Sequence, residues 1–186
     1  MRAVWRCTNS TMKTHMHLRN VISIQTCDPV QFFSEHRMDL VCKYALFRDL
    51  HTKKHDDFVW DLYRQHIVAR NGGVEPEHCH NTKTIAKNSI DDFMYCAKEL
   101  YHSMSTQGFD PEYPVPYTLT GVLLNGAHRL GCAAALGISV VTACIRDNRH
   151  KGTPWNTQWF SDNNFTTKQI DYITDLLQQI TTKEPK

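Results

Sequence analysis

The sequence predicts an α/β (α+β) fold in which helices precede and follow a compact strand–helix–strand core. Size and composition support a globular domain, because the chain has 186 residues, of which 41% are hydrophobic and 22% charged. Apolar residues recur at helical spacing through the first half of the chain. The second half instead combines short apolar, β-branched runs with an alanine-rich segment, which is typical of an α/β unit.

The first half is predicted to contain one strand and three helices. The β-branched residues of "VISIQ" (21–25) favour a strand. Apolar residues then recur at helical spacing over 37–50, over 55–70 and, after an irregular stretch, over 91–106. The irregular stretch, 71–90, is rich in glycine and polar residues, and loops of this length in compact chains are usually functional or mobile.

The second half is predicted to hold the α/β unit and a closing helix. The elements of the unit are, in order, the strands "YPVPYTL" (113–119) and "VLL" (122–124), the helix "AHRLGCAAALG" (127–137) and the buried strand "ISVVTACI" (138–145). Residues 148–164 have no clear periodicity and are expected to be irregular. Thr166 or Thr167 is suited to cap a last helix, because either hydroxyl can accept from the first turn.

Charge and composition exclude several functional classes. A formal net charge of +2 is too small for a typical nucleic-acid-binding domain. No run of apolar residues is long enough to cross a membrane. Seven cysteines, an odd number without a C-x-x-C pair, indicate a reduced, cytoplasmic protein. "EHCH" (77–80) has no second ligand pair at zinc-finger spacing, so no protein metal site is expected. Residues 1–20 lack an apolar signal core and are expected to form a flexible arm.

One short stretch, Asn125 to Arg129, is the clearest candidate site. Gly126 removes the Cβ that would keep a ligand away from the backbone. If a helix starts near Ala127, its unpaired N–H groups and its dipole favour an anion there. Arg129 can hold two phosphate oxygens with its planar fork, and His128 can donate once more. An ordinary surface helix start, with Arg129 in a surface ion pair, is the competing interpretation.

A longer pattern surrounds this stretch. A helix ending in glycine ("ELYHSMSTQGF") precedes a proline-bearing strand ("YPVPY") and a hairpin strand, and Gly-x-His-Arg, an alanine-rich helix, Leu-Gly and a final strand follow. This order, over 91–145, resembles the ParB/sulfiredoxin superfamily. The resemblance implies a ParB/sulfiredoxin-like core over 71–186, with 21–70 as a helical extension. In that family the motif binds nucleotide phosphates, which implies the nucleotide ligands Asn125, Gly126, Ala127, His128 and Arg129.

Departures from the family pattern favour one of its activities. Sulfiredoxins carry a catalytic cysteine where this chain has Ala127, so sulfinic-acid repair by that route is not expected. Partition proteins have Gly-Glu-x-Arg and a following helix-turn-helix, and too little chain follows residue 145 for such a DNA reader. Free-serine kinases of the superfamily resemble the chain in their Gly-x-His-Arg-like motif. The resemblance thus implies a kinase that uses ATP or ADP with Mg²⁺, CTP being a further option.

Residues outside the motif complete the expected site. By position in the serine kinases, Glu75 is the first candidate for the general base and Glu77 the second, although a loop glutamate is more often a solvated charge. Lys83 and Lys87 lie in the same loop, where a lysine can reach phosphate as a point charge. Two further candidates are the pair Asp39 and Lys43, four residues apart on a helix, where a surface ion pair is the simpler interpretation. With Tyr44 they would line a substrate pocket.

The sequence therefore favours a phosphotransferase in which His128 and Arg129 stabilise the transferred charge and Glu75 is the base. Its partners would be a nucleotide and a small hydroxyl-bearing acceptor. Two alternatives from other classes stay open. One is a non-catalytic nucleotide-sensing or DNA-associated module, and the other is a ParB-like nuclease, for which the motif supplies no clustered carboxylates. Turnover of the nucleotide that depends on an added acceptor would separate the phosphotransferase from these two alternatives.

Overall fold

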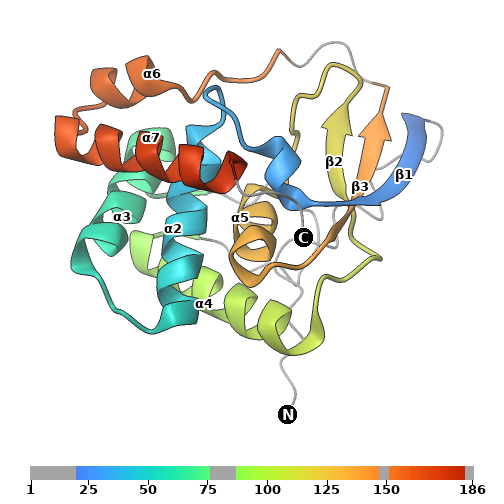
Figure 1. Cartoon of the computed structure of the whole chain (residues 1–186), viewed down its shortest axis with the longest axis horizontal. Helices are drawn as coiled ribbons and strands as arrows, with labels where there is room; N and C mark the ends of the chain where they lie inside the picture. Colours follow the sequence, from blue (N-terminus) through green and yellow to red (C-terminus); the bar gives the residue numbers. More distant parts are fainter. Residues whose placement is uncertain (1–19, 76–86, 147–150, 183–186) are drawn as a thin grey trace.

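The computed structural model describes residues 20–75, 87–146 and 151–182. In this part of the chain six α-helices accompany a three-stranded mixed sheet (Figure 1). The helices are α2 (Met38–Thr52), α3 (Asp57–Asn71), α4 (Ile90–Gln107), α5 (Ala127–Leu136), α6 (Thr157–Asp162) and α7 (Thr167–Thr181). The strands are β1 (Val21–Cys27), β2 (Val115–Thr118) and β3 (Val140–Ile145), and a short 3-10 helix, η2 (Pro29–Phe32), follows β1.

The sheet has the order β1-β3-β2, with the last strand in the middle. β3 pairs antiparallel with β1 and parallel with β2, and α5 forms the crossover between the parallel pair. The strand–helix–strand unit expected from the sequence is thereby confirmed. The expected strand at 122–124 is wrong, because among the described residues only an isolated bridge joins Leu123 to Tyr117. A tight turn closes at Gly121, which has a φ of 81°, and beyond it the backbone N–H of Leu124 donates to the carbonyl of Pro116 at 3.0 Å.

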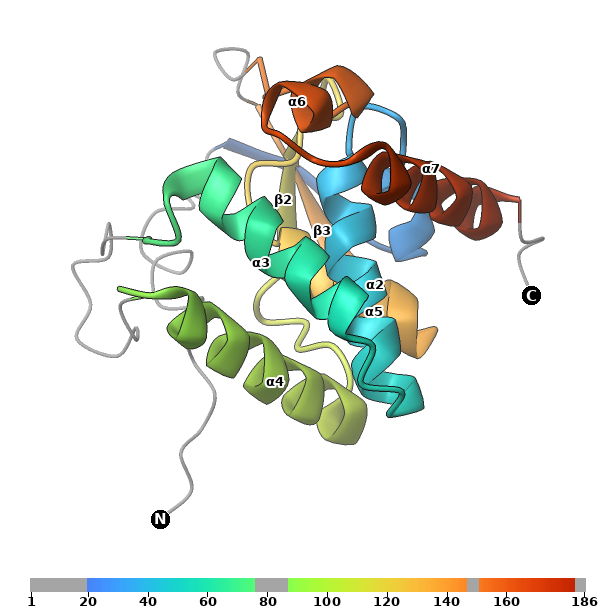
Figure 2. The same ribbon diagram turned by 90° about the vertical axis from the view of Figure 1, so that its left-hand side faces the viewer.

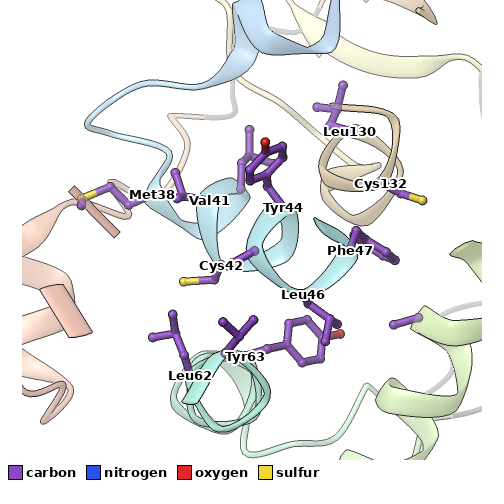
Figure 3. Close-up of a cluster of buried hydrophobic side chains, with 14 of the residues drawn as sticks. Met38, Val41, Cys42, Tyr44, Leu46, Phe47, Leu62, Tyr63, Leu130 and Cys132 are labelled. Atoms are coloured by element: carbon purple, nitrogen blue, oxygen red, sulfur yellow. The ribbon is translucent and has the colours of Figure 1, made fainter. Parts of the chain in front are cut away.

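Helix α2 is the centre of the core. Its buried side chains lie on all of its faces, which is expected of a helix enclosed by other elements rather than one lying on the surface. Leu62 and Tyr63 of α3 pack on one side of it, and Leu130 and Cys132 of α5 lie on another (Figure 3). Helices α3 and α4 run side by side across this layer (Figure 2). The core therefore joins both halves of the chain.

A glycine sets the distance between α2 and α5. A Cβ added at Gly131 would lie 2.9 Å from the Cβ of Lys43 and 3.1 Å from the backbone nitrogen of Tyr44. Real Cβ atoms do not approach other atoms so closely, so only glycine permits this crossing. The close approach holds the backbone of Lys43 against the middle of α5.

Two features differ from the sequence-based expectation of helices and loops. The segment expected to be irregular, 148–164, contains α6 in its described part. Asn156 caps this helix, because its side chain accepts from the backbone N–H of Trp159 at 3.0 Å. Residues 21–70, expected as an extension, supply the edge strand β1 and the central helix α2.

Candidate functional site

The start of α5 presents backbone donors without a capping side chain. Gly126 is the N-cap residue, with a φ of 92°, and no side chain of the described residues caps the helix. Within the described parts of the chain, the N–H groups of Ala127 and His128 have no hydrogen-bond acceptor. The side chain of Asn125 instead accepts from the N–H of Gly126 at 2.6 Å. This helix start can therefore bind an anion through its backbone.

A side chain at Gly126 would also crowd its neighbours. An added Cβ would lie 3.2 Å from both methyl groups of Val115 on β2 and 3.0 Å from Nη2 of Arg129. The left-handed backbone would be strained by any side chain as well. A glycine at this position gives a ligand access to the backbone, as expected from the sequence, and it also allows close packing against β2.

His128 is held by a buried tyrosine from α3. The hydroxyl of Tyr63, which has no exposed surface, lies 2.8 Å from Nε2 of His128. Burial, followed by the charges of Lys43 and Lys87, lowers the pKa of His128 well below its usual value. The ring is therefore neutral at pH 7. The charged groups that act on it most strongly, which also include Arg70, are all cations.

A buried ion cluster lies on α2 beside this site. Nζ of Lys43 donates to the carboxylate of Asp39 at 3.2 Å and to the carbonyl of the same residue at 3.0 Å. Arg37 binds both oxygens of that carboxylate, at 2.7 and 2.9 Å. Asp39 is 3% exposed and Lys43 is 0% exposed, so the surface pair considered from the sequence is wrong. Two cations share one carboxylate here.

Opposing effects set the charge states of this cluster. Burial alone would raise the pKa of Asp39, but Lys43 and Arg37 outweigh it and hold the pKa well below its ordinary value. Burial lowers the pKa of Lys43, and Asp39 only partly offsets that shift. The carboxylate is therefore ionised at neutral pH.

His66 is a member of this cluster that sequence reasoning missed. It has no exposed surface, and neither ring nitrogen has a hydrogen-bond partner in the part of the chain that the structure describes. Burial and then Lys43 lower its pKa well below the usual value, so the ring is neutral. Its ring centroid lies between 5.8 and 6.0 Å from those of Trp155, Trp159 and Phe160. Most buried polar groups are paired, so this imidazole is exceptional.

Glu75 and Lys87, the predicted base and one predicted phosphate ligand, are bound to each other. Nζ of Lys87 donates to Oε2 of Glu75 at 2.6 Å, and the two residues also form a backbone bridge. Lys87 lies 4.9 Å above the ring of Phe93. The positive charge of Lys87 also contributes to the lowered pKa of His128, at the start of α5.

Arg129 has a structural position that the sequence did not reveal. Its side chain is 6% exposed and donates through Nη1 to the carbonyl of Tyr113, in the loop before β2. The guanidinium also lies 5.9 Å from the centroid of the Phe109 ring. Burial lowers the pKa of Arg129 to about 10, so it stays charged at neutral pH. Arg129 thus fixes that loop to the first turn of α5.

The remaining predicted residues lie apart from this cluster or outside the described chain. Tyr44 is 8% exposed, and its ring packs edge-on against that of Phe33, at 6.1 Å. Glu77, Lys83 and "EHCH" (77–80) lie outside the described residues. The structure therefore brings together Asp39, Lys43, Glu75, Lys87 and His128, and adds Tyr63, His66 and Arg70 from α3. These three recur at helical spacing, a signal visible in the sequence.

Other chemistries find little support in the described chain. No group of three or more His, Cys, Asp or Glu side chains there could hold a metal ion. Burial raises the pKa of Cys42 and Cys132, so neither thiol is a thiolate at neutral pH. Of the described helices, none is both long and apolar enough to cross a membrane. Comparisons with protein-family models, curated proteins and solved structures find no match to the chain.

Proposed function

We propose that the chain is a nucleotide-dependent phosphotransferase that binds phosphates at the start of α5 and acts on a small hydroxyl-bearing molecule. ATP or ADP, with Mg²⁺ held mainly by the phosphates and water, is the proposed donor. The resemblance of 91–145 to the ParB/sulfiredoxin superfamily supports the nucleotide. The resemblance of the Gly-x-His-Arg motif to the small-molecule kinases supports the transfer.

One observation carries this proposal. Among the described residues, the first turn of α5 offers backbone N–H groups without acceptors, and the charged groups that act most strongly on its His128 are cations. A helix start and nearby positive charge both favour an anion. In the surrounding cluster, the cations Arg37, Lys43, Arg70 and Lys87 outnumber the carboxylates of Asp39 and Glu75.

The chemistry of phosphoryl transfer fits such a site, because it needs charge neutralisation and alignment more than covalent catalysis. The N–H groups of Ala127 and His128 would bind phosphate oxygens. Lys43 and Lys87 would supply positive charge. Arg129, bound to the loop before β2, would hold the turn in place. Glu75 would accept the proton of the acceptor hydroxyl, with Lys87 positioning its carboxylate.

A second candidate function is a non-catalytic nucleotide-binding module. The observation that favours it is the ion pair at 2.6 Å between Glu75 and Lys87, which engages the predicted base. Such a module would bind nucleotide through the same helix start but would not turn it over. A nuclease has no comparable support, because the described residues contain no candidate metal cluster.

The sharpest test adds one negative charge without changing shape. Asn125→Asp keeps the oxygen that accepts from Gly126 and places a carboxylate beside the start of α5. The change should maintain or raise stability, because a carboxylate there interacts well with the helix dipole. It should weaken ATP or ADP binding, measured by calorimetry with Mg²⁺, by about ten-fold or more, since about 1.4 kcal/mol of repulsion suffices.

The matched control is Asn156→Asp, which places the same charge at the start of α6. It should leave nucleotide affinity unchanged. Equal affinity of Asn125→Asp and the native protein would overturn the proposed site. Acceptor-dependent formation of ADP or AMP would support the kinase. Binding without turnover over a panel of small alcohols and amino acids would favour the non-catalytic module.

A further inference from the structure

We propose that Tyr63 is a positioning residue that holds His128 in the tautomer with its proton on Nδ1. In this state the neutral ring offers one N–H donor to a bound phosphate. The phosphate ligand in this inference rests on the proposed function, whereas the contact between Tyr63 and His128 does not. It follows from the contact between the two side chains and from what surrounds each of them.

The hydroxyl of Tyr63 has a single partner among the described residues. Tyr63 has no exposed surface, and in the described part of the chain its hydroxyl is hydrogen-bonded to His128 alone, at 2.8 Å. Burial raises the pKa of Tyr63, so the phenol keeps its proton at neutral pH. One hydrogen therefore belongs to the phenol and one to the neutral ring.

Only one arrangement satisfies the phenol. If Nε2 of His128 carried the proton, it would donate to the oxygen of Tyr63, and the phenol hydrogen would have no acceptor in a buried place. If Nε2 is unprotonated, the phenol donates its hydrogen to it, and both groups are satisfied. The proton of His128 must then be on Nδ1. Isolated neutral imidazole side chains favour the other tautomer, so the protein selects this one.

The selected tautomer decides which ligands the ring can bind. Among the described residues Nδ1 of His128 has no hydrogen-bond partner, and it is not a fully buried atom. With a proton on Nδ1 the ring can donate but not accept. It therefore suits the oxygens of a phosphate group and does not suit an amine or another donor. Its role matches that of the neighbouring N–H groups, which are also donors.

The tautomer is directly measurable. Long-range proton–nitrogen NMR of the histidine rings, at neutral pH without ligand, distinguishes the two ring nitrogens, and His128→Gln assigns the signal. The native protein should show a protonated Nδ1. Tyr63→Phe, which removes only the hydroxyl, should shift His128 toward the Nε2–H form. A native ring with the proton on Nε2 would overturn the inference without the need for any variant.

The chain offers a matched control. Tyr101 of α4 lies 3.2 Å from Nδ1 of His51, a second tyrosine–histidine pair on other elements. Tyr101→Phe should leave the His128 signals unchanged. A His128 shift as large in Tyr101→Phe as in Tyr63→Phe would indicate a general loss of structure and would contradict a specific role for Tyr63.

Titration with inorganic phosphate and with ATP separates the tautomer from the phosphate site. Binding should shift the Nδ1–H signal of His128, and Tyr63→Phe should weaken the affinity by about ten-fold, the loss of one hydrogen bond to a charged group. Failure of the native protein to bind either ligand would overturn the phosphate site and leave the tautomer standing. Equal affinity of the native protein and Tyr63→Phe would show that the selected tautomer does not serve binding.

Discussion

At the scale of single residues, the buried charges on α2 are costly to remove from water. Lys43 has no exposed side-chain surface and Asp39 is nearly as buried. Removing such a pair from water costs free energy that the pairing recovers only when every charge is satisfied. Here Arg37 completes the cluster by binding both oxygens of the Asp39 carboxylate.

Removing the one carboxylate of this cluster should therefore be severe. Asp39→Asn leaves Lys43 buried without its counter-charge, and the free energy of unfolding should fall by about 3–5 kcal/mol. Urea unfolding followed by circular dichroism measures this change. The matched control is Asp61→Asn, which breaks the exposed i,i+3 pair with Arg64 and should cost no more than about 1 kcal/mol. Equal losses in both variants would contradict the buried cluster.

At the scale of elements, the crossing of α2 and α5 decides where the site forms. Gly131 lets α5 approach the backbone of Lys43, while the first turn of α5 faces the cluster through His128. Arg129 binds the loop before β2, so this turn is fixed on the side of the sheet as well. Packing between helices therefore brings the start of α5 next to the ion cluster of α2.

Gly131→Ala tests this crossing. Alanine favours a helix over glycine by about 1 kcal/mol, so a helix without close neighbours would gain stability. Here the new Cβ would clash with Lys43 and the backbone of Tyr44, and overpacking should give a net loss of about 1–3 kcal/mol. The larger Gly131→Ser should cost more. Thermal unfolding measures both, and a stabilised Gly131→Ala would refute the close approach.

At the scale of the whole molecule, both halves of the chain build one core. β1 pairs with β3 along its length, and α2 lies between α3 and α5. A fragment spanning 71–186 would lose an edge strand and the central helix. We expect that fragment to lack a cooperative thermal transition and dispersed amide NMR signals. A folded fragment would show that 21–70 is a separate extension, as the sequence indicates.

Acid should destabilise the whole molecule through two neutral imidazoles. The pKa values of His66 and His128 are lowered in the folded state, so below about pH 6.5 the unfolded chain binds more protons than the folded one. The free energy of unfolding should be at its full value above that pH. Below it, the free energy of unfolding should fall by up to about 1.4 kcal/mol per pH unit for each ring. Urea unfolding between about pH 7.5 and pH 5, a range that spans the ordinary pKa of histidine, measures how steeply the free energy of unfolding changes with pH.

A substitution of His66 separates the contributions of the two histidines to this acid sensitivity. His66→Leu removes a buried ring that has no hydrogen-bond partners, so it should raise stability at pH 5 and reduce the acid slope to about half. His102→Gln, on the exposed face of α4, should leave the slope in place. An unchanged slope in His66→Leu would place the acid sensitivity elsewhere.

Most elements were predictable from the sequence, because hydrophobic periodicity indicates which face of a helix is buried. The helix α6 was not, since its six residues are too few to show a period, and the bridge at Leu123 could not be distinguished from a strand. In the site, Lys43 and His128 could each be named as candidates from the sequence, but their closeness in space could not be predicted. The direction of Arg129 and the isolation of His66 depend on packing between distant segments, which local patterns do not encode.

The contact between Asn125 and Gly126 also has a consequence for how the protein ages. The backbone nitrogen of Gly126 lies 2.6 Å from the carboxamide oxygen of Asn125, and glycine offers no side chain to shield it. Attack of that nitrogen on the carboxamide carbon expels ammonia and forms a cyclic imide, which water opens to aspartate or isoaspartate. Old or alkaline preparations should therefore acquire a negative charge at the start of α5, and the proposed phosphate affinity would fall with the age of the sample.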